Sequence, residues 1–294
     1  MLQDIPVNVQ QGVRKLFSAS GEIVLKDFRL SGGGCINHGG RLTTSLGNFF
    51  LKWNDVARLP AMFELESRGL QLLRSAQVVD IPEVIGFGQA ENSQYLVLSF
   101  INENAPSKHY WKKLGQQLAG LHRVTNNFYG LDHNNYIGSL RQSNKQDESW
   151  VQFFIEQRLQ VQVKLASDSG LIELEWLKKF ESFYTRLPSL IPEEQPSLLH
   201  GDLWSGNVMV NEKGDPCLID PAVYFGHREA DLAMTQLFEM FNREFYSSYE
   251  DGFPLLPGHS ERVDIYNLYP LLVHLNLFGP AYLNSIKTIV RKFI

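Results

Sequence analysis

The stretch HGDLWSGN at residues 200–207, together with LIDP at residues 218–221, decides how this chain is expected to fold. It carries an aspartate at position 202, an asparagine five residues later and a second aspartate, Asp220, at the end of the next apolar segment. Phosphoryl transfer needs such a set, because one carboxylate orients the attacking hydroxyl and accepts its proton, while two oxygen ligands hold magnesium against the nucleotide phosphates. Asp202 therefore fits the catalytic base, and Asn207 and Asp220 fit the metal ligands. A solvated turn between strands would explain any one of these residues, but not all three together.

The first hundred residues predict a small sheet and one helix. Apolar segments bounded by turn residues indicate strands at 22–30, 41–44, 48–53, 85–88 and 95–101, with a glycine-rich loop at 31–35. Pro60 suits the first turn of a helix that runs to about Ser75. A polar, proline-containing break at residues 102–106 then marks the expected domain boundary.

Helical periodicity dominates the rest of the chain. Helices are expected at 108–123, 149–166, 171–186 and 229–243, and short apolar segments at 198–200, 208–210 and 217–219 predict a small buried hairpin that carries loops. We therefore expect an α+β protein of two domains. Residues 1–102 form the nucleotide-binding domain, an antiparallel sheet with one helix, and residues 103–294 form a larger, mainly helical catalytic and substrate-binding domain.

Lys52 is the candidate phosphate-binding residue of the first domain. It lies in an otherwise apolar strand, so its ammonium either reaches outward to solvent or meets a specific anion. Its place after a glycine loop and before a helix with two glutamates is typical of a lysine that binds the α- and β-phosphates of a nucleotide and pairs with a helix carboxylate. Helical spacing puts Glu66 on the apolar face and Glu64 beside Arg68. Glu66 is therefore the expected partner of Lys52.

Five motifs together resemble one family of small-molecule kinases. They are GGGCI at 32–36, NYIG at 135–138, HGDLWSGN at 200–207, DPAVYFGHREADLAM at 220–234 and HLNLFG at 274–279. This set is similar to the fructosamine (ketosamine) kinases, within the aminoglycoside-phosphotransferase-like branch of the protein-kinase fold. The resemblance implies a bilobal kinase-like fold that transfers the γ-phosphate of ATP to a sugar hydroxyl of a ketosamine, the rearranged adduct of a sugar with an amine. It places the phosphate on the third sugar carbon and implies deglycation as the role.

The resemblance implies ATP and Mg²⁺ as cofactors. It also adds further residues to the candidate site. The expected ATP-binding residues are Gly32, Gly33, Gly34, Cys35, Lys52, Glu66, Ser99, Phe100 and Ile101, with adenine against the last three. The glycine run is not a G-x-G-x-x-G sequence, so its contact with nucleotide rests on the resemblance. Candidate substrate contacts are Trp204, Tyr136 and His274. Trp204 could equally be a buried loop anchor, and Tyr136 and His274 are weaker candidates, since residues of these types are more often core than contact. His200 and Asp231 are expected to support the catalytic loop rather than to react, Asp231 through backbone amides.

The two cysteines have different expected roles. Cys35 either packs as a small buried residue or, near the cationic Lys52, has a lowered pKa that makes it oxidisable. The chain is therefore expected to be a monomer or a redox-linked dimer. Cys217 lies in an apolar segment and is expected in the core. Two cysteines are too few for a disulfide framework, which favours a reducing compartment.

Composition excludes several other classes of protein. Hydrophobic residues make up 44% and charged residues 20% of the chain, which is typical of a globular protein. The formal net charge of -5 offers no electrostatic footprint for nucleic acid. The N-terminus lacks the pattern of a secretory signal, and polar residues and prolines interrupt the apolar stretch 265–283, so we expect a cytoplasmic protein with no membrane partner.

Partners and alternatives follow from the same residues. The expected partners are ketosamine small molecules or glycated lysines of proteins. One alternative is a kinase of another small alcohol, such as an aminoglycoside, choline or a sugar. Another is a nucleotide-binding regulator without turnover, although the complete set of Lys52, Asp202, Asn207 and Asp220 argues against it.

Overall fold

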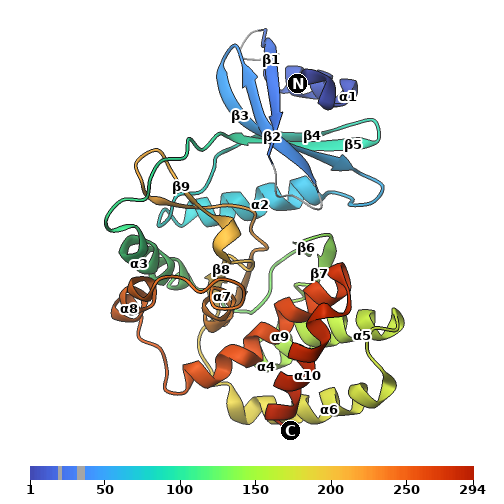
Figure 1. The fold of residues 1–294 in the computed structure, drawn as a ribbon, viewed down its shortest axis with the longest axis vertical. Coiled ribbons are helices and arrows are strands. Elements are labelled where there is room, and N and C mark those ends of the chain that lie inside the picture. Colours follow the sequence, from blue (N-terminus) through green and yellow to red (C-terminus); the bar gives the residue numbers. More distant parts are fainter. Residues whose placement is uncertain (19–21, 32–36) are drawn as a thin grey trace. The chain divides into compact units, whose positions relative to one another are not determined.

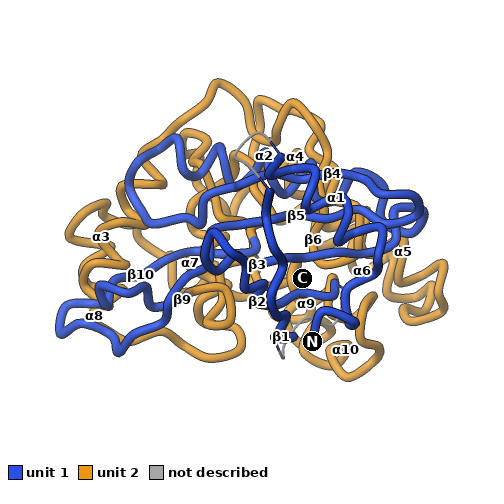
Figure 2. Tube along the Cα trace, turned by 90° about the horizontal axis from the view of Figure 1, so that it is seen from above, with its two compact units in different colours: residues 1–110, 209–220 blue, residues 111–208, 221–294 orange. Residues whose placement is uncertain are grey.

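The computed structural model describes residues 1–18, 22–31 and 37–294, and its chain forms two compact units (Figures 1 and 2). Unit 1 comprises Met1–Tyr110 and Met209–Asp220, and unit 2 comprises Trp111–Val208 and Pro221–Ile294. The domain boundary after residue 102 stays a prediction, although residues 209–220 group with the first unit by their contacts. The predicted nucleotide contacts of Gly32, Gly33, Gly34 and Cys35 lie outside the described residues.

Unit 1 is built on a five-stranded antiparallel sheet in the order β1-β2-β3-β5-β4 (Figure 1). Its strands are β1 (Leu25–Leu30), β2 (His38–Thr44), β3 (Gly47–Asp55), β4 (Val84–Ala90) and β5 (Ser93–Ser99). The 3₁₀ turn η1 (Leu2–Asp4) precedes helix α1 (Val7–Leu16), and α1 and α2 (Met62–Ser75) both pack against β4 and β5. Leu51–Asn54 of the central strand β3 are all buried, and because successive side chains point to opposite faces, both faces of the sheet are covered there. A hairpin of β9 (Val208–Val210) and β10 (Pro216–Leu218) leads to Asp220.

Unit 2 is mainly helical, with α9 (His259–Phe278) packed against α7, α5 and α10. Its other helices and turns are α3 (Tyr110–His122), α4 (Trp150–Phe153), the π-helical turn η3 (Phe154–Leu159), α5 (Gln160–Asp168), α6 (Leu174–Leu190), η4 (Ser205–Asn207), α7 (Glu229–Met234), α8 (Arg243–Gly252), η5 (Pro280–Tyr282) and α10 (Leu283–Lys292). Two short antiparallel pairs complete it: β6 (Asn135–Ile137) with β7 (Leu140–Gln142), and β8 (Ser197–Leu199) with β11 (Tyr224–Gly226). α9 is buried almost continuously from Ile265 to Val273, because it is apolar on all faces there. The predicted α+β class is confirmed.

Three sequence-based expectations about these elements are wrong. The helix expected over 229–243 is two helices, since α7 ends at Met234 and Asn242 caps α8 by accepting a hydrogen bond from the Glu244 amide. β8 pairs with β11 rather than joining the hairpin of β9 and β10. The helix expected from Pro60 begins at Met62. Among the described residues, no helix combines the length and apolar content needed to cross a bilayer.

Candidate active site

Lys52 is the centre of a buried ion cluster in unit 1. It is 6% exposed, and its Nζ donates to Glu66 Oε1 at 2.8 Å and to Asp220 Oδ1 at 2.6 Å. Burial alone would lower the pKa of Lys52, but the carboxylates of Asp220 and Glu66 outweigh it and hold that pKa above its usual value. The ammonium therefore stays charged and fixed in the centre of the strand.

The choice between the two glutamates of α2 follows from the helix face that each occupies. Glu66 points from α2 to Lys52, whereas Glu64 accepts from the Arg68 guanidinium at 2.6 Å on the exposed face. This is the arrangement that the spacing predicts. Burial raises the pKa of Glu66, and Lys52 opposes that shift. Each charge in this pair therefore depends on the other to remain ionised.

Asp220 is held in a conformation that costs free energy. Its φ is 53°, in the left-handed region that only glycine, asparagine and aspartate enter readily. Its side chain is 46% exposed although one oxygen is bonded to Lys52. Strained residues of this kind concentrate at functional sites, because the rest of the fold must hold them there.

A cavity of about 410 Å³ lies within unit 1, beside Asp220. The predicted adenine contacts Ser99, Phe100 and Ile101 line it, where the chain leaves β5. Other lining residues were not predicted and include Arg41, Phe50, Met209 and Ile219. Phe50 lies two residues before Lys52 and therefore on the same face of β3, a signal that the strand alternation contained. The Arg41 guanidinium lies 5.8 Å above the Phe100 ring.

The catalytic loop of unit 2 joins two of the predicted site residues directly. Asn207 Nδ2 donates to the main-chain oxygen of Asp202 at 2.8 Å and to its Oδ2 at 3.0 Å. Both amide hydrogens therefore point at Asp202, which leaves the amide oxygen as the only group of Asn207 able to act as a ligand. Asn207 is 6% exposed, so its side chain is fixed in this orientation.

Asp231 anchors the start of this loop. Its carboxylate accepts the backbone N–H of His200 at 2.8 Å and of Gly201 at 2.9 Å. Gly201 has a φ of +80°, and an added Cβ there would lie 2.1 Å from the carbonyl oxygen of Ala222, so only glycine fits. His200 is fully buried, and its Nδ1 accepts from the Asp202 amide at 3.3 Å. The backbone that presents Asp202 is therefore held on both sides.

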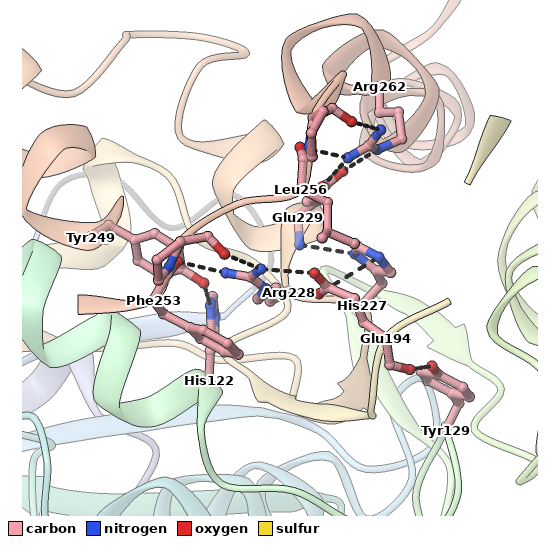
Figure 3. Close-up of polar contacts among 12 residues, drawn as sticks. His122, Tyr129, Glu194, His227, Arg228, Glu229, Tyr249, Phe253, Leu256 and Arg262 are labelled. Atoms are coloured by element: carbon pink, nitrogen blue, oxygen red, sulfur yellow. Dashed lines mark hydrogen bonds and ion pairs between the residues drawn. The ribbon is translucent and has the colours of Figure 1, made fainter. Parts of the chain in front are cut away.

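Buried polar contacts also link His122 with Tyr249 and Arg228 with Glu194 (Figure 3). His122 Nε2 donates to Asp231 Oδ2 at 3.2 Å, and its Nδ1 lies 2.8 Å from the Tyr249 hydroxyl. Arg228 makes two hydrogen bonds to Glu194, of 2.7 and 2.8 Å. This support was not predicted, because its partners lie 34 to 127 positions apart in the sequence and meet only in the fold.

A second buried network holds the chain that follows the LIDP motif. Gln142 donates to the carbonyl oxygen of Ala222 at 3.0 Å, and Asn135 donates to that of Val223 at 2.8 Å. Asn144 donates to Asn135 at 2.9 Å. The Ala222 amide in turn donates to the carbonyl oxygen of His200 at 2.9 Å. This network therefore steadies the catalytic loop and accounts for Asn135 of the NYIG motif.

Arg158 completes that network as a buried cation with neutral partners. It is fully buried, and its Nη2 donates to Asn144 Oδ1 at 2.8 Å, while its Nη1 donates to the carbonyl oxygen of Ser143. The guanidinium lies 4.0 Å from the centre of the Tyr224 ring and 4.7 Å from that of Phe153. Aromatic faces and carbonyl oxygens thus take the place of a carboxylate.

The predicted substrate contacts lie in two places within unit 2. Trp204 is 37% exposed and meets Phe238, which in turn meets His274. Tyr136 lies buried in β6, with the Arg141 guanidinium 5.4 Å from its ring centre. The structure therefore brings Trp204 and His274 into one aromatic cluster, while Tyr136 lies in the sheet of β6 and β7.

Comparison with known proteins agrees with these features. A family model described as fructosamine kinase matches residues 10–294. The chain belongs to the fructosamine kinase family. A probable ketoamine kinase of Vibrio parahaemolyticus is 39% identical over 277 residues, which cover 92% of this chain and 93% of that protein. A chloroplastic protein-ribulosamine 3-kinase of Arabidopsis thaliana is 35% identical over 272 residues, which cover 90% of this chain and 81% of that protein.

Solved structures give the same assignment. Proteins assigned as fructosamine-3-kinases from Haemophilus somnus and Thermobifida fusca superpose on this chain with TM-scores of 0.88 and 0.87, at 26% and 29% identity. The first match covers 96% of each chain, and the second covers 97% of this chain and 98% of the other. An aminoglycoside phosphotransferase with a TM-score of 0.62 and 16% identity shares the fold. The family resemblance and the kinase-like fold, both predicted from the motifs, are confirmed. This protein is therefore a phosphotransferase whose acceptor is an alcohol group.

Proposed function

We propose that this protein is an ATP-dependent kinase that phosphorylates the hydroxyl on the third sugar carbon of ketosamines. The observation that carries the proposal is the ion cluster of Lys52, Glu66 and Asp220, because Asp220 also lines the cavity of unit 1. A fixed ammonium beside such a cavity suits the α- and β-phosphates of a nucleotide. Ser99 to Ile101 would then contact adenine. The Arabidopsis relative, named a ribulosamine 3-kinase, supports the choice of acceptor and carbon.

Asp202 is the proposed base. The acceptor hydroxyl attacks the γ-phosphorus, the bond to the oxygen bridging to the β-phosphate breaks, ADP leaves, and the hydroxyl proton passes to Asp202. The hydrogen bonds from Asn207 and the anchored loop hold this carboxylate in one orientation before the acceptor arrives. Pre-positioning of this kind lowers the barrier without a rearrangement of the loop.

The donor groups also fit Mg²⁺. Asn207 has its amide oxygen as its remaining ligand atom, and Asp220 presents a half-exposed carboxylate. Mg²⁺ prefers oxygen ligands and commonly takes only one or two protein carboxylates, with phosphates and water for the rest. When bound, it would neutralise charge on the phosphates. We therefore propose Asn207 and Asp220 as its protein ligands.

The biological role that follows is deglycation. Loss of phosphate from the third carbon and hydrolysis of the resulting imine would release a free amine. The test is incubation of the protein with ATP, Mg²⁺ and ketosamines derived from glucose, ribose and tetrose, followed by ³¹P NMR of the products. We expect a new phosphate ester and then free phosphate and amine. Phosphorylation of an aminoglycoside or choline, with none of the ketosamines modified, would refute the proposal.

A further inference from the structure

An exposed strip of aromatic side chains begins at the catalytic loop and runs across unit 2. We call it the aromatic strip, and it consists of Trp204, Phe238, His274, Phe278 and Tyr282. The ring centres of Trp204 and Phe238 lie 6.2 Å apart, and those of Phe238 and His274 lie 4.7 Å apart. His274 lies 5.3 Å from Phe278 and 5.2 Å from Tyr282. The strip is therefore continuous in space although its members come from separate segments.

The strip is too exposed to be ordinary core. Trp204 is 37%, Phe238 42% and Phe278 52% exposed. Contiguous exposed apolar surface of this kind usually marks a binding site. The Trp204 indole packs on Gly206, where an added Cβ would lie 2.3 Å from the ring. This close packing holds the first ring of the strip in place two residues from Asp202.

Two polar groups give the strip a definite chemistry. His274 Nδ1 lies 2.8 Å from the carbonyl oxygen of Pro270 and therefore carries the hydrogen. Burial lowers the pKa of His274, so the ring is neutral at pH 7 and its Nε2 is an acceptor. The exposed carboxylate of Glu239, next to Phe238, accepts a hydrogen bond from Ser205 Oγ at 3.1 Å. The strip thus combines aromatic faces, a neutral acceptor and a negative charge.

These groups match the amine half of a ketosamine better than its sugar half. The ketosamine nitrogen is a secondary amine that is protonated near neutral pH, so it is both a cation and a donor of hydrogen bonds. Aromatic faces attract cations, and Glu239 adds a negative charge at the same surface. An acidic substituent on that nitrogen would be repelled by Glu239, whereas an apolar or aromatic one would cover the exposed rings.

We propose that the aromatic strip is the subsite for the amine half of the acceptor, selecting ketosamines with apolar or aromatic N-substituents over acidic ones. The inference rests on the proposed function and adds a substrate preference to it. The ketosamine nitrogen lies near Glu239 and His274, and its substituent extends over Phe278 and Tyr282. Trp204 remains beside the sugar.

The first test compares two fructosamines, one of benzylamine and one of methylamine, on the wild type and on Phe278→Ala. Phe278 is half exposed at the end of α9, so its replacement leaves the core intact. We expect the ratio of kcat/KM values, benzyl over methyl, to fall about tenfold, which is the size of one aromatic contact. The matched control is Leu174→Ala, since Leu174 is 77% exposed at the start of α6 and should leave the ratio unchanged.

The second test uses Glu239→Gln with the fructosamines of glycine and of glycinamide, which differ in one carboxylate. The wild type should prefer glycinamide, and the variant should lose most of that preference. An unchanged benzyl-to-methyl ratio in Phe278→Ala, an unchanged carboxylate preference in Glu239→Gln, or a dimer that Phe278→Ala dissociates would overturn the inference. Turnover of the methyl compound by the wild type would still support the proposed function, whereas no turnover of any fructosamine would overturn both.

Discussion

Two aspartates with proposed roles in phosphoryl transfer, Asp202 in unit 2 and Asp220 in unit 1, are held in different ways. Asp202 accepts a hydrogen bond from a neutral amide, Asn207, on a loop whose backbone is tied to Asp231. Asp220 is bonded to a cation, Lys52, and its backbone has a positive φ. The contact described for Asp202 is with a neutral amide, whereas Asp220 contacts a cation and has a strained backbone.

The difference corresponds to the two tasks of phosphoryl transfer. A base must hold one oxygen toward the acceptor hydroxyl, and the hydrogen bond from the Asn207 amide helps to orient the carboxylate of Asp202. A group that works with nucleotide phosphates and metal must hold its negative charge among other charges, and Lys52 balances it. The proposed roles therefore predict different consequences when each is changed.

The largest expected effect is that of Asp202→Asn. The change removes the proposed proton acceptor but leaves the cavity of unit 1 untouched, so kcat should fall about 10²- to 10⁴-fold while the Kd for ATP stays close to that of the wild type. Steady-state kinetics with a ketosamine and calorimetric titration with ATP measure the two quantities. Asp168→Asn, at an exposed aspartate of α5, serves as the control. Near-normal turnover would show that the catalytic base lies elsewhere.

Asp220→Ala should differ by affecting nucleotide binding as well as turnover. It removes a proposed Mg²⁺ ligand and one of the two anions bonded to Lys52. We expect activity to fall by about 10²-fold and ATP affinity to become much less dependent on Mg²⁺. Titration of ATP at low and high Mg²⁺ measures this. The same Mg²⁺ dependence in variant and wild type would contradict the ligand assignment.

Lys52→Met should destabilise the protein in a pH-dependent way. Removing one partner of a buried pair costs about 3 to 5 kcal/mol, because Glu66 is left buried without a cation. Burial already raises the pKa of Glu66, and loss of Lys52 raises it further, so the folded variant binds a proton more readily than the unfolded chain. Its stability should therefore rise as pH falls from 8 to 5.

The wild type supplies the contrast for that experiment. The pKa of Lys52 is raised in the folded state, so its contribution is fully present below about pH 10.5, the unfolded value, and is lost only above it. Urea unfolding at pH 5 and pH 8 should thus show a gap between wild type and variant that narrows at the lower pH. A gap of equal size at both values would mean that Glu66 does not depend on Lys52.

The sequence predicts the charged residues of the candidate site better than the buried residues that hold them in place. Lys52 and Glu66 could be paired because helical periodicity places Glu66 on the apolar face. Asp220 was identified from its motif, and its hydrogen bond with Lys52 was not predicted. The loop from Asp202 to Asn207 lies within one motif. Arg158 and His122 could not be identified, because their partners lie in other segments of the chain and neither residue carries a local signal. The break between α7 and α8 was missed for a related reason, since helical periodicity alone does not reveal where a helix ends.

Asp231→Asn tests whether the anchored loop matters for turnover. The substitution places an NH₂ group where one oxygen accepts backbone amides, so at least one donor of His200 or Gly201 loses its partner. A buried donor without a partner costs about 1 to 3 kcal/mol. We expect lower stability together with a lower kcat and an unchanged KM for ATP, measured by urea unfolding and kinetics. A raised KM for ATP with a normal kcat would show that Asp231 serves nucleotide binding instead.

The smallest expected effect concerns the strand that carries Asp220. Cys217, in β10, is 3% exposed, and burial, with a smaller contribution from Asp80, raises the pKa of its thiol to about 12. At pH 8 the native thiol is therefore both protonated and covered, so a thiol reagent should label it only when β10 opens. In the Cys35→Ser variant Cys217 is the remaining cysteine. We expect the reagent to modify Cys217 slowly in the native variant and completely in urea, and mass spectrometry measures the extent of modification. Addition of ATP and Mg²⁺ should slow the native reaction further if Asp220 binds the metal. Labelling as rapid in the native protein as in urea would mean that β10 does not hold Asp220 rigidly, and charge rather than strand packing would then keep Asp220 in place.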